Sequence, residues 1–167
     1  MRRAERINDL IVFLARVGVG LSLAVLMTAV LIQVVGRLTG SSPVWTEELT
    51  RYALLYMVAF GAGLAFRSGD LVNVDVVCEA LPGRLPCLLR LLAAGASAAL
   101  ALYLLPLAWK FVSIGSMQTA PALGVRMDFV HVTVWLLLLG LAVFGGLRVF
   151  GMLSGAENGK PVKPEED

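Results

Sequence analysis

Residues 17–36, VGVGLSLAVLMTAVLIQVVG, decide the class of this protein, because they form an uncharged apolar stretch between Arg16 and Arg37. A transmembrane helix needs about 20 such residues. The chain has 167 residues, of which 58% are hydrophobic and only 16% are charged, and its mean hydropathy is +0.82. A soluble domain carries about 25% charged residues. We therefore predict a membrane protein and exclude a disordered chain and a nucleic-acid-binding surface.

A cleaved signal peptide is the alternative interpretation of residues 17–36. We do not favour it, because the apolar run is longer than the core of a signal peptide, which has about 7–15 residues. In addition, no Ala-x-Ala cleavage pattern follows the run. We therefore expect residues 17–36 to stay in the membrane as the first span.

Three more spans are predicted. Residues 91–109 and 129–147 are uncharged stretches that are long enough to cross a bilayer. Residues 52–66 alone would make a helix of only about 22 Å, so we expect this helix to begin earlier, with Ser42 as N-cap and Pro43 in its first position. Pro106 should bend the third helix in its last turn. The predicted fold is an all-α membrane protein with transmembrane helices at about residues 17–36, 43–66, 88–109 and 129–148, which form one bundle within residues 1–154.

The basic residues predict the orientation of these spans. Ten of the 14 Lys and Arg residues lie in the N-terminal segment, the middle loop and the C-terminal segment, and four lie in the first and third loops. Because cytoplasmic loops carry the excess of Lys and Arg, both termini and the middle loop are predicted to be cytoplasmic. Trp45 and Trp109 then lie at the outer interface, where an aromatic belt is expected.

The middle loop contains a short amphipathic segment at residues 71–81. Val74, Val77 and Leu81 share one helical face, and Pro82 ends the segment. We predict a short interfacial helix between the second and third spans. The tail of residues 155–167 is rich in Gly, Pro and charged residues, and it is predicted to be disordered in the cytoplasm.

Residue types that catalyse reactions or bind metals are scarce. Cys78 and Cys87 are not spaced as Cys-x-x-Cys, and His131 is the single histidine. This excludes a dithiol redox site, a haem held by two histidines and a multi-histidine metal site. Both cysteines lie on the predicted cytoplasmic side, where we expect reduced thiols with a packing role. We predict no catalytic residue, no cofactor and no metal, and we do not expect an enzyme.

The predicted spans contain few polar groups. No charged residue and no histidine lies in the middle of a span, although an ion-coupled carrier needs such groups near mid-membrane. Gln33 and Tyr103 are expected to form hydrogen bonds across helix interfaces. His131 follows Asp128 by about one helical turn, so we expect a structural role with a possible hydrogen bond between these two residues.

One polar cluster lies at the start of the second span. Glu47 and Arg51 are four residues apart with the acid first, which favours an ion pair within the helix. One interpretation is a helix end that anchors at the membrane interface. The other is a contact with a second subunit, because charges close to hydrocarbon tend to be paired or to face protein. This cluster comprises Trp45, Glu47, Glu48, Arg51 and Tyr52.

Small residues recur four positions apart in three of the spans. Such pairs let helix backbones approach closely, and they pack either within one bundle or against a second membrane protein. The pairs are Ala59 with Gly63, Gly61 with Ala65, Gly95 with Ala99, and Ala142 with Gly146.

Residues 45–75, WTEELTRYALLYMVAFGAGLAFRSGDLVNVD, resemble the small membrane subunit of the tripartite ATP-independent periplasmic (TRAP) transporters, DctQ type. The likeness consists of a Trp-x-Glu-Glu-Leu-x-Arg-Tyr start, a Gly-x-x-x-Ala midsection and a basic-Gly-acidic turn leading to Val-Asp. The chain departs from the family before the fourth span, where Leu-Gly-Ile-Pro is frequent but Arg126 follows Val125. The matching positions are Trp45, Glu47, Glu48, Leu49, Arg51, Tyr52, Phe60, Gly61, Ala65, Arg67, Gly69, Val74 and Asp75.

The resemblance implies a subunit of the bacterial inner membrane that supports a larger partner. A large TRAP membrane subunit would carry the sodium and substrate sites, and a periplasmic binding protein would deliver an organic acid. This chain would be the fixed scaffold and part of the docking surface, in contact with membrane lipids. The expected interface residues are Trp45, Glu47, Glu48, Arg51 and Tyr52 at the outer boundary, and Arg67, Asp70 and Asp75 at the inner one.

Two other functions remain open at this stage. A self-sufficient, homo-oligomeric exporter or pore would need a membrane-embedded acid or a polar stripe. A membrane redox enzyme would need the cysteine or histidine pairs that the chain lacks. Transport by the chain alone would favour the first of these, and a haem or quinone spectrum would favour the second.

Overall fold

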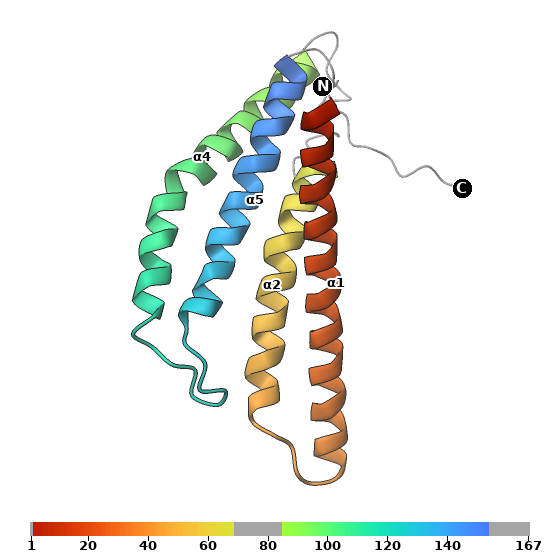
Figure 1. The fold of residues 1–167 in the computed structure, drawn as a ribbon, viewed down its shortest axis with the longest axis vertical. Coiled ribbons are helices and arrows are strands. Elements are labelled where there is room, and N and C mark those ends of the chain that lie inside the picture. The colour runs from red at the N-terminus through yellow and green to blue at the C-terminus, as the bar shows by residue number, and fades with distance from the viewer. Residues whose placement is uncertain (1, 69–84, 154–167) are drawn as a thin grey trace, which may run out of the picture.

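The computed structural model describes residues 2–68 and 85–153, which form four α-helices (Figure 1). Each helix contains a stretch that is long and apolar enough to cross a membrane. The predicted all-α architecture with four spans is therefore confirmed. The interfacial helix expected at residues 71–81 and the tail at residues 155–167 lie outside the described residues. The helices are α1 (Arg2–Leu38), α2 (Trp45–Ser68), α4 (Leu85–Gly115) and α5 (Asp128–Leu153).

The chain reverses direction twice at the same end of the molecule. The segments 39–44 and 116–127 both lie at the bottom of Figure 1, whereas α1 starts and α5 ends at the top. We call these the loop end and the terminal end. Such an arrangement matches an even number of crossings with both termini on one side. On the basis of the Lys and Arg distribution, the loop end is expected to face outward.

The four helices form an open layer. α2 packs against α1 and α5, and α5 packs in turn against α4; no other pair of helices in the described chain brings its backbones together. Figure 1 shows the resulting order α4, α5, α2, α1. Consequently α1 and α4 each have a single neighbouring helix, and each keeps an outer face that no described helix covers.

Small residues explain why the inner contacts are close. A Cβ atom on Gly63 of α2 would lie 3.0 Å from the Phe144 ring of α5, and one on Gly18 of α1 would lie 2.7 Å from the Phe60 ring of α2. Ala59, one turn before Gly63, is also buried. In a bilayer, such packing replaces the hydrophobic effect as the force between helices. The predicted pair of Ala59 and Gly63 therefore lies in the interface between α2 and α5.

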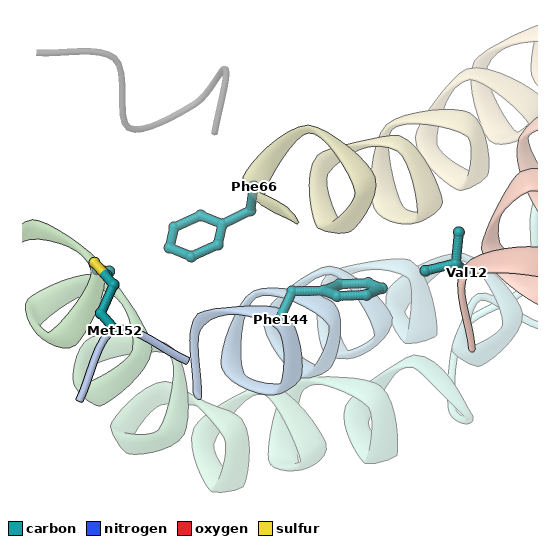
Figure 2. Close-up of a cluster of buried hydrophobic side chains, with 5 residues drawn as sticks. Val12, Phe66, Phe144 and Met152 are labelled. Carbon is teal, nitrogen blue, oxygen red and sulfur yellow. The ribbon is translucent and has the colours of Figure 1, made fainter. Parts of the chain in front are cut away.

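The main apolar core lies toward the terminal end, where all four helices contribute a side chain. Figure 2 shows the Phe144 ring of α5 pointing toward Val12 of α1, with Phe66 of α2 and Met152 further along. Ala94 of α4 completes the buried cluster. Although the backbones of α1 and α5 do not approach each other, Val12 and Phe144 connect them through side chains. The described apolar core thus connects all four helices toward the terminal end.

Several helix boundaries differ from the predicted spans. α1 runs without interruption from Arg2, so the N-terminal basic segment continues the first helix. α2 begins at Trp45, two residues after the predicted start at Pro43. α4 continues to Gly115, and this places Pro106 inside the helix rather than in its last turn. Figure 1 shows that α4 changes direction along its length, as expected of a helix that contains an interior proline.

Candidate functional site

The site begins with the first turn of α2. Thr46 is fully buried, and its hydroxyl donates a hydrogen bond to the Pro43 carbonyl at 2.7 Å. The next two residues are Glu47 and Glu48. Acidic side chains are favourable here, because the amino end of a helix carries a partial positive charge. The first turn of α2 therefore carries two carboxylates at the loop end of the molecule.

Glu48 connects α2 to the loop between α4 and α5. One carboxylate oxygen, Oε2, accepts hydrogen bonds from the backbone N–H groups of Ala122 at 3.1 Å and Leu123 at 3.0 Å. The Ala122 N–H also lies 3.2 Å from Oε1. Hydrogen bonds from two consecutive amides to an ionised carboxylate are among the stronger ones in proteins. Glu48 thus holds a loop that is more than seventy residues away in the sequence.

The loop that Glu48 holds is itself well organised. The Ala120 N–H donates to the Val125 carbonyl at 2.8 Å, and the Met127 N–H donates to the Gln118 carbonyl at 2.9 Å. Gly124 has a φ of +67°, a backbone conformation that favours glycine. The loop therefore closes as a narrow turn.

Glu47 faces α1 and not its own helix. Its carboxylate accepts hydrogen bonds from Gln33 Nε2 and Arg37 Nη2, both at 3.3 Å. The predicted ion pair between Glu47 and Arg51 is therefore wrong, because the hairpin of α1 and α2 brings two closer donors to Glu47. Arg51 is exposed and makes no hydrogen bond or ion pair with the described residues. The hydrogen bond predicted for Gln33 across a helix interface is present.

Two tyrosines of α2 reach the start of α5. The Tyr52 hydroxyl contacts the Met127 sulfur at 3.7 Å, and the Tyr56 hydroxyl donates to the Phe129 carbonyl at 2.5 Å. Sequence reasoning selected Tyr52 but missed Tyr56. The available signal was the spacing of four residues, which places both rings on one face of α2. Together with Glu48, they give α2 three contacts with the segment 122–129.

Asp128 and His131 have separate roles at the start of α5. Asp128 accepts the Phe129 N–H at 3.0 Å and pairs with Arg126 at 2.6 Å. His131 Nδ1 lies 3.1 Å from the Phe111 carbonyl, and the two rings stack with their centroids 4.0 Å apart. Because a carbonyl only accepts, this contact requires a proton on Nδ1. The structural role expected for His131 is supported, but its partner is Phe111 and not Asp128.

The remaining predicted site residues are divided between the two ends of the molecule. Trp45 is partly exposed at the loop end. Arg67 lies in the last turn of α2, at the terminal end. Asp70 and Asp75 lie outside the described residues, and so does Cys78. The structure thus brings together the outer half of the predicted interface.

Arg148 is a site residue that sequence reasoning missed. Its side chain is only 7% exposed, and its Nη1 donates to the Phe66 carbonyl near the carboxyl end of α2 at 3.1 Å. A cation at this end of a helix is favourable. In the sequence, Arg148 reads only as the charged boundary of the fourth span. Its burial follows from the position of α2 beside α5, which the sequence alone does not show.

The geometry of the site supports a structural task. Among the described residues, no three His, Cys, Asp or Glu side chains are close enough to hold a metal ion. Both carboxylates of the α2 start already accept hydrogen bonds from the protein itself. The arrangement fixes the positions of helices and of the loop between α4 and α5, and it leaves Arg51 free for another molecule.

Comparison with known proteins identifies the family of the chain. No curated protein matches the chain. The family model "Tripartite ATP-independent periplasmic transporters, DctQ component" matches residues 26–155, which is well over half of the chain. This family comprises components of transporters and not enzymes. Together with the four apolar helices, the match supports a multi-pass protein of the bacterial inner membrane. The chain therefore belongs to the DctQ family, the small membrane subunits of the TRAP transporters.

Proposed function

We propose that this chain is the fixed scaffold of a sodium-driven, binding-protein-dependent transporter for organic acids. A large TRAP membrane subunit carries the sodium and substrate sites, and a periplasmic binding protein delivers the substrate. Both termini of the scaffold face the cytoplasm, and the loop end forms part of the docking surface for the binding protein. The sodium coupling, the substrate class and the partners follow from the family.

One observation carries the scaffold role: α2 and α5 are tied together at both ends. At the loop end, the Tyr56 hydroxyl donates to the Phe129 carbonyl. At the terminal end, Arg148 donates to the Phe66 carbonyl. A helix pair that is held at two points along its length resists both sliding and rotation. A subunit with this construction suits the part of a transporter that stays still while another part moves.

The polar groups within the spans support a division of labour. The hydroxyls of Ser22, Thr28 and Thr133 donate to carbonyls of their own helices at 2.6–2.8 Å. None of these three hydroxyls therefore keeps a proton to donate to a carboxylate substrate. Transport of an organic acid with sodium requires several convergent polar groups at one depth. We accordingly place cargo binding in the large subunit.

The loop end offers the features of a docking surface. Met117 is 89% exposed and Val44 is 73% exposed, whereas Arg51 is exposed and without a described ionic partner. Glu48 holds the neighbouring loop in one arrangement. A preorganised surface binds a partner without first having to be ordered. An acidic patch on the binding protein would complement Arg51.

The test is reconstitution of the transporter in proteoliposomes with an inward sodium gradient. We expect uptake of a labelled dicarboxylate with all three proteins, and loss of uptake when this chain is omitted. Accumulation by this chain alone would instead show a self-sufficient carrier or pore and would overturn the proposal. A gradient of potassium in place of sodium is the control for ion coupling.

A further inference from the structure

The two outer helices of the layer differ in how their polar groups are satisfied. On α1, the Ser22 and Thr28 hydroxyls donate to carbonyls of α1, and Gln33 donates to Glu47. The exposed remainder of the span is aliphatic and aromatic, with Leu21 and Leu31 as examples. Such a face suits lipid, because it presents no polar group that needs a partner.

On α4, the Tyr103 hydroxyl lacks such a hydrogen-bond partner among the described residues. The residue is 70% exposed, and its hydroxyl makes no hydrogen bond with any described residue. The hydrogen bond that we predicted for Tyr103 across a helix interface is therefore not formed with any described helix. A hydroxyl without a partner is costly in hydrocarbon. The depth of Tyr103 in the membrane decides how far this cost applies.

Tyr103 lies well inside the span. It precedes Trp109 by six residues, or about 9 Å along the helix axis. Trp109 packs edge-on against Trp135, with ring centroids 5.7 Å apart, and tryptophans of this kind mark headgroup depth. Helical side chains lean toward the amino end of their helix. Since α4 runs from the terminal end to the loop end, the Tyr103 side chain leans away from the headgroups at the loop end and toward the middle of the bilayer.

Pro106 adds a second polar group close to Tyr103. A proline has no N–H, so the Leu102 carbonyl, four residues earlier, loses its helical donor. Pro106 is exposed, and the Leu102 side chain is 60% exposed. One donor, the Tyr103 hydroxyl, and one acceptor, the Leu102 carbonyl, therefore occur on adjacent residues of the otherwise apolar stretch 98–109.

These two groups lie within a row of exposed residues along α4. The residues of this row are spaced alternately by four and three positions, and they lie opposite the buried Ala94, Ala98 and Ala101 that face α5. Alternation of this kind gives the seam of a packed helix pair. A Cβ atom on the adjacent Gly95 would meet nothing within 4 Å. We call the exposed residues Leu92, Ala96, Ala99, Tyr103 and Pro106 the α4 stripe.

We propose that the α4 stripe binds a transmembrane helix of the large membrane subunit. That helix supplies an acceptor for the Tyr103 hydroxyl and a donor for the Leu102 carbonyl, and it packs closely over Ala96 and Ala99. The existence of the partner rests on the proposed function, whereas the choice of α4 over α1 rests on the unmatched polar groups. Lipid tails offer neither donor nor acceptor, so lipid alone does not complement this face.

The first test compares two bulky substitutions at exposed alanines, Ala99→Trp on α4 and Ala24→Trp on α1. The tagged chain is co-expressed with the large subunit, and the retained large subunit is measured after affinity purification in mild detergent. We expect Ala99→Trp to lower retention by about tenfold, since a large ring separates helices that pack through small residues. Ala24→Trp should leave retention unchanged.

Equal retention in both variants, or loss only with Ala24→Trp, would overturn the inference. Circular dichroism and thermal unfolding of each variant alone show whether it still folds. A wild-type chain that does not retain the large subunit would instead count against the proposed function. If the purified chain dimerises, and Ala99→Trp breaks this dimer while the large subunit is retained, the occupant is a second copy and the inference is wrong.

The second test removes one atom. Tyr103→Phe keeps the ring and deletes the hydroxyl, and we expect about a threefold loss of retention, in line with the modest strength of hydrogen bonds between membrane helices. The unfolding temperature of the chain alone should not change, because the hydroxyl has no described partner within it. A fall in the unfolding temperature with unchanged retention would show that the hydroxyl stabilises the fold of this chain and does not bind the large subunit.

Discussion

The two ends of the molecule are held together in different ways. At the terminal end, Phe144 and Val12 pack inside an apolar cluster, and the buried Arg148 reaches across to α2. At the loop end, the contacts are mainly hydrogen bonds of partly exposed groups, with Glu48 and Glu47 as acceptors. Contacts of the first kind determine whether the layer forms, and contacts of the second kind determine the shape of its outer surface.

This comparison predicts that the largest loss of stability follows from a core substitution at the terminal end. Phe144→Ala removes a ring that fills the space beside Gly63 and Val12. The cavity left behind should cost about 3–5 kcal/mol of unfolding free energy. Thermal unfolding of the purified chain in detergent measures this loss. A variant as stable as wild type would show that the cluster does not hold the layer together.

Arg148→Leu should produce the next largest effect. The substitution keeps an apolar volume but leaves the Phe66 carbonyl without this donor, which should cost about 1–3 kcal/mol. Arg148→Lys is the matched control, because it retains a cation near the carboxyl end of α2 and should recover part of the loss. If Arg148→Leu were more stable than wild type, the tie at the terminal end would not support the scaffold role.

Glu48→Gln should have a smaller and more local effect. Glutamine has nearly the same size as glutamate, but the hydrogen bonds to the Ala122 and Leu123 amides lose their charge assistance, which should cost about 1 kcal/mol. Hydrogen exchange of these two amides should accelerate, while that of the helix interiors stays unchanged. Equal acceleration throughout the chain would mean that Glu48 stabilises the whole fold and not only the loop.

The smallest effect on stability is expected for the exposed cations of the loop end. Arg37→Ala removes an ion pair whose two side chains are 66% and 49% exposed, and pairs of this kind contribute about 0–1 kcal/mol. Arg51→Ala should leave stability unchanged but lower uptake in the reconstituted transporter. Unchanged uptake would remove Arg51 from the docking surface and leave the start of α2 as a lipid anchor.

The four spans were predictable because hydropathy over about 20 residues is a local property of the sequence. The contacts between the spans were not predictable in this way. The rule for residues four apart predicted a pair of Glu47 with Arg51, but the hairpin places Arg37 nearer to Glu47. The partners of Glu48 are backbone amides, which have no side-chain signature. Arg148 looked like the boundary of a span until α2 was found beside it.

The order α4, α5, α2, α1 has a consequence for the surrounding bilayer. Four helices in one row form a flat layer with two broad faces, and lipid acyl chains on one face cannot pass directly to the other. The perimeter is also greater than that of four helices gathered in a square, so a micelle around the isolated chain must contain more detergent. A partner helix bound to the α4 stripe would continue the row at its α4 edge and displace detergent from that edge.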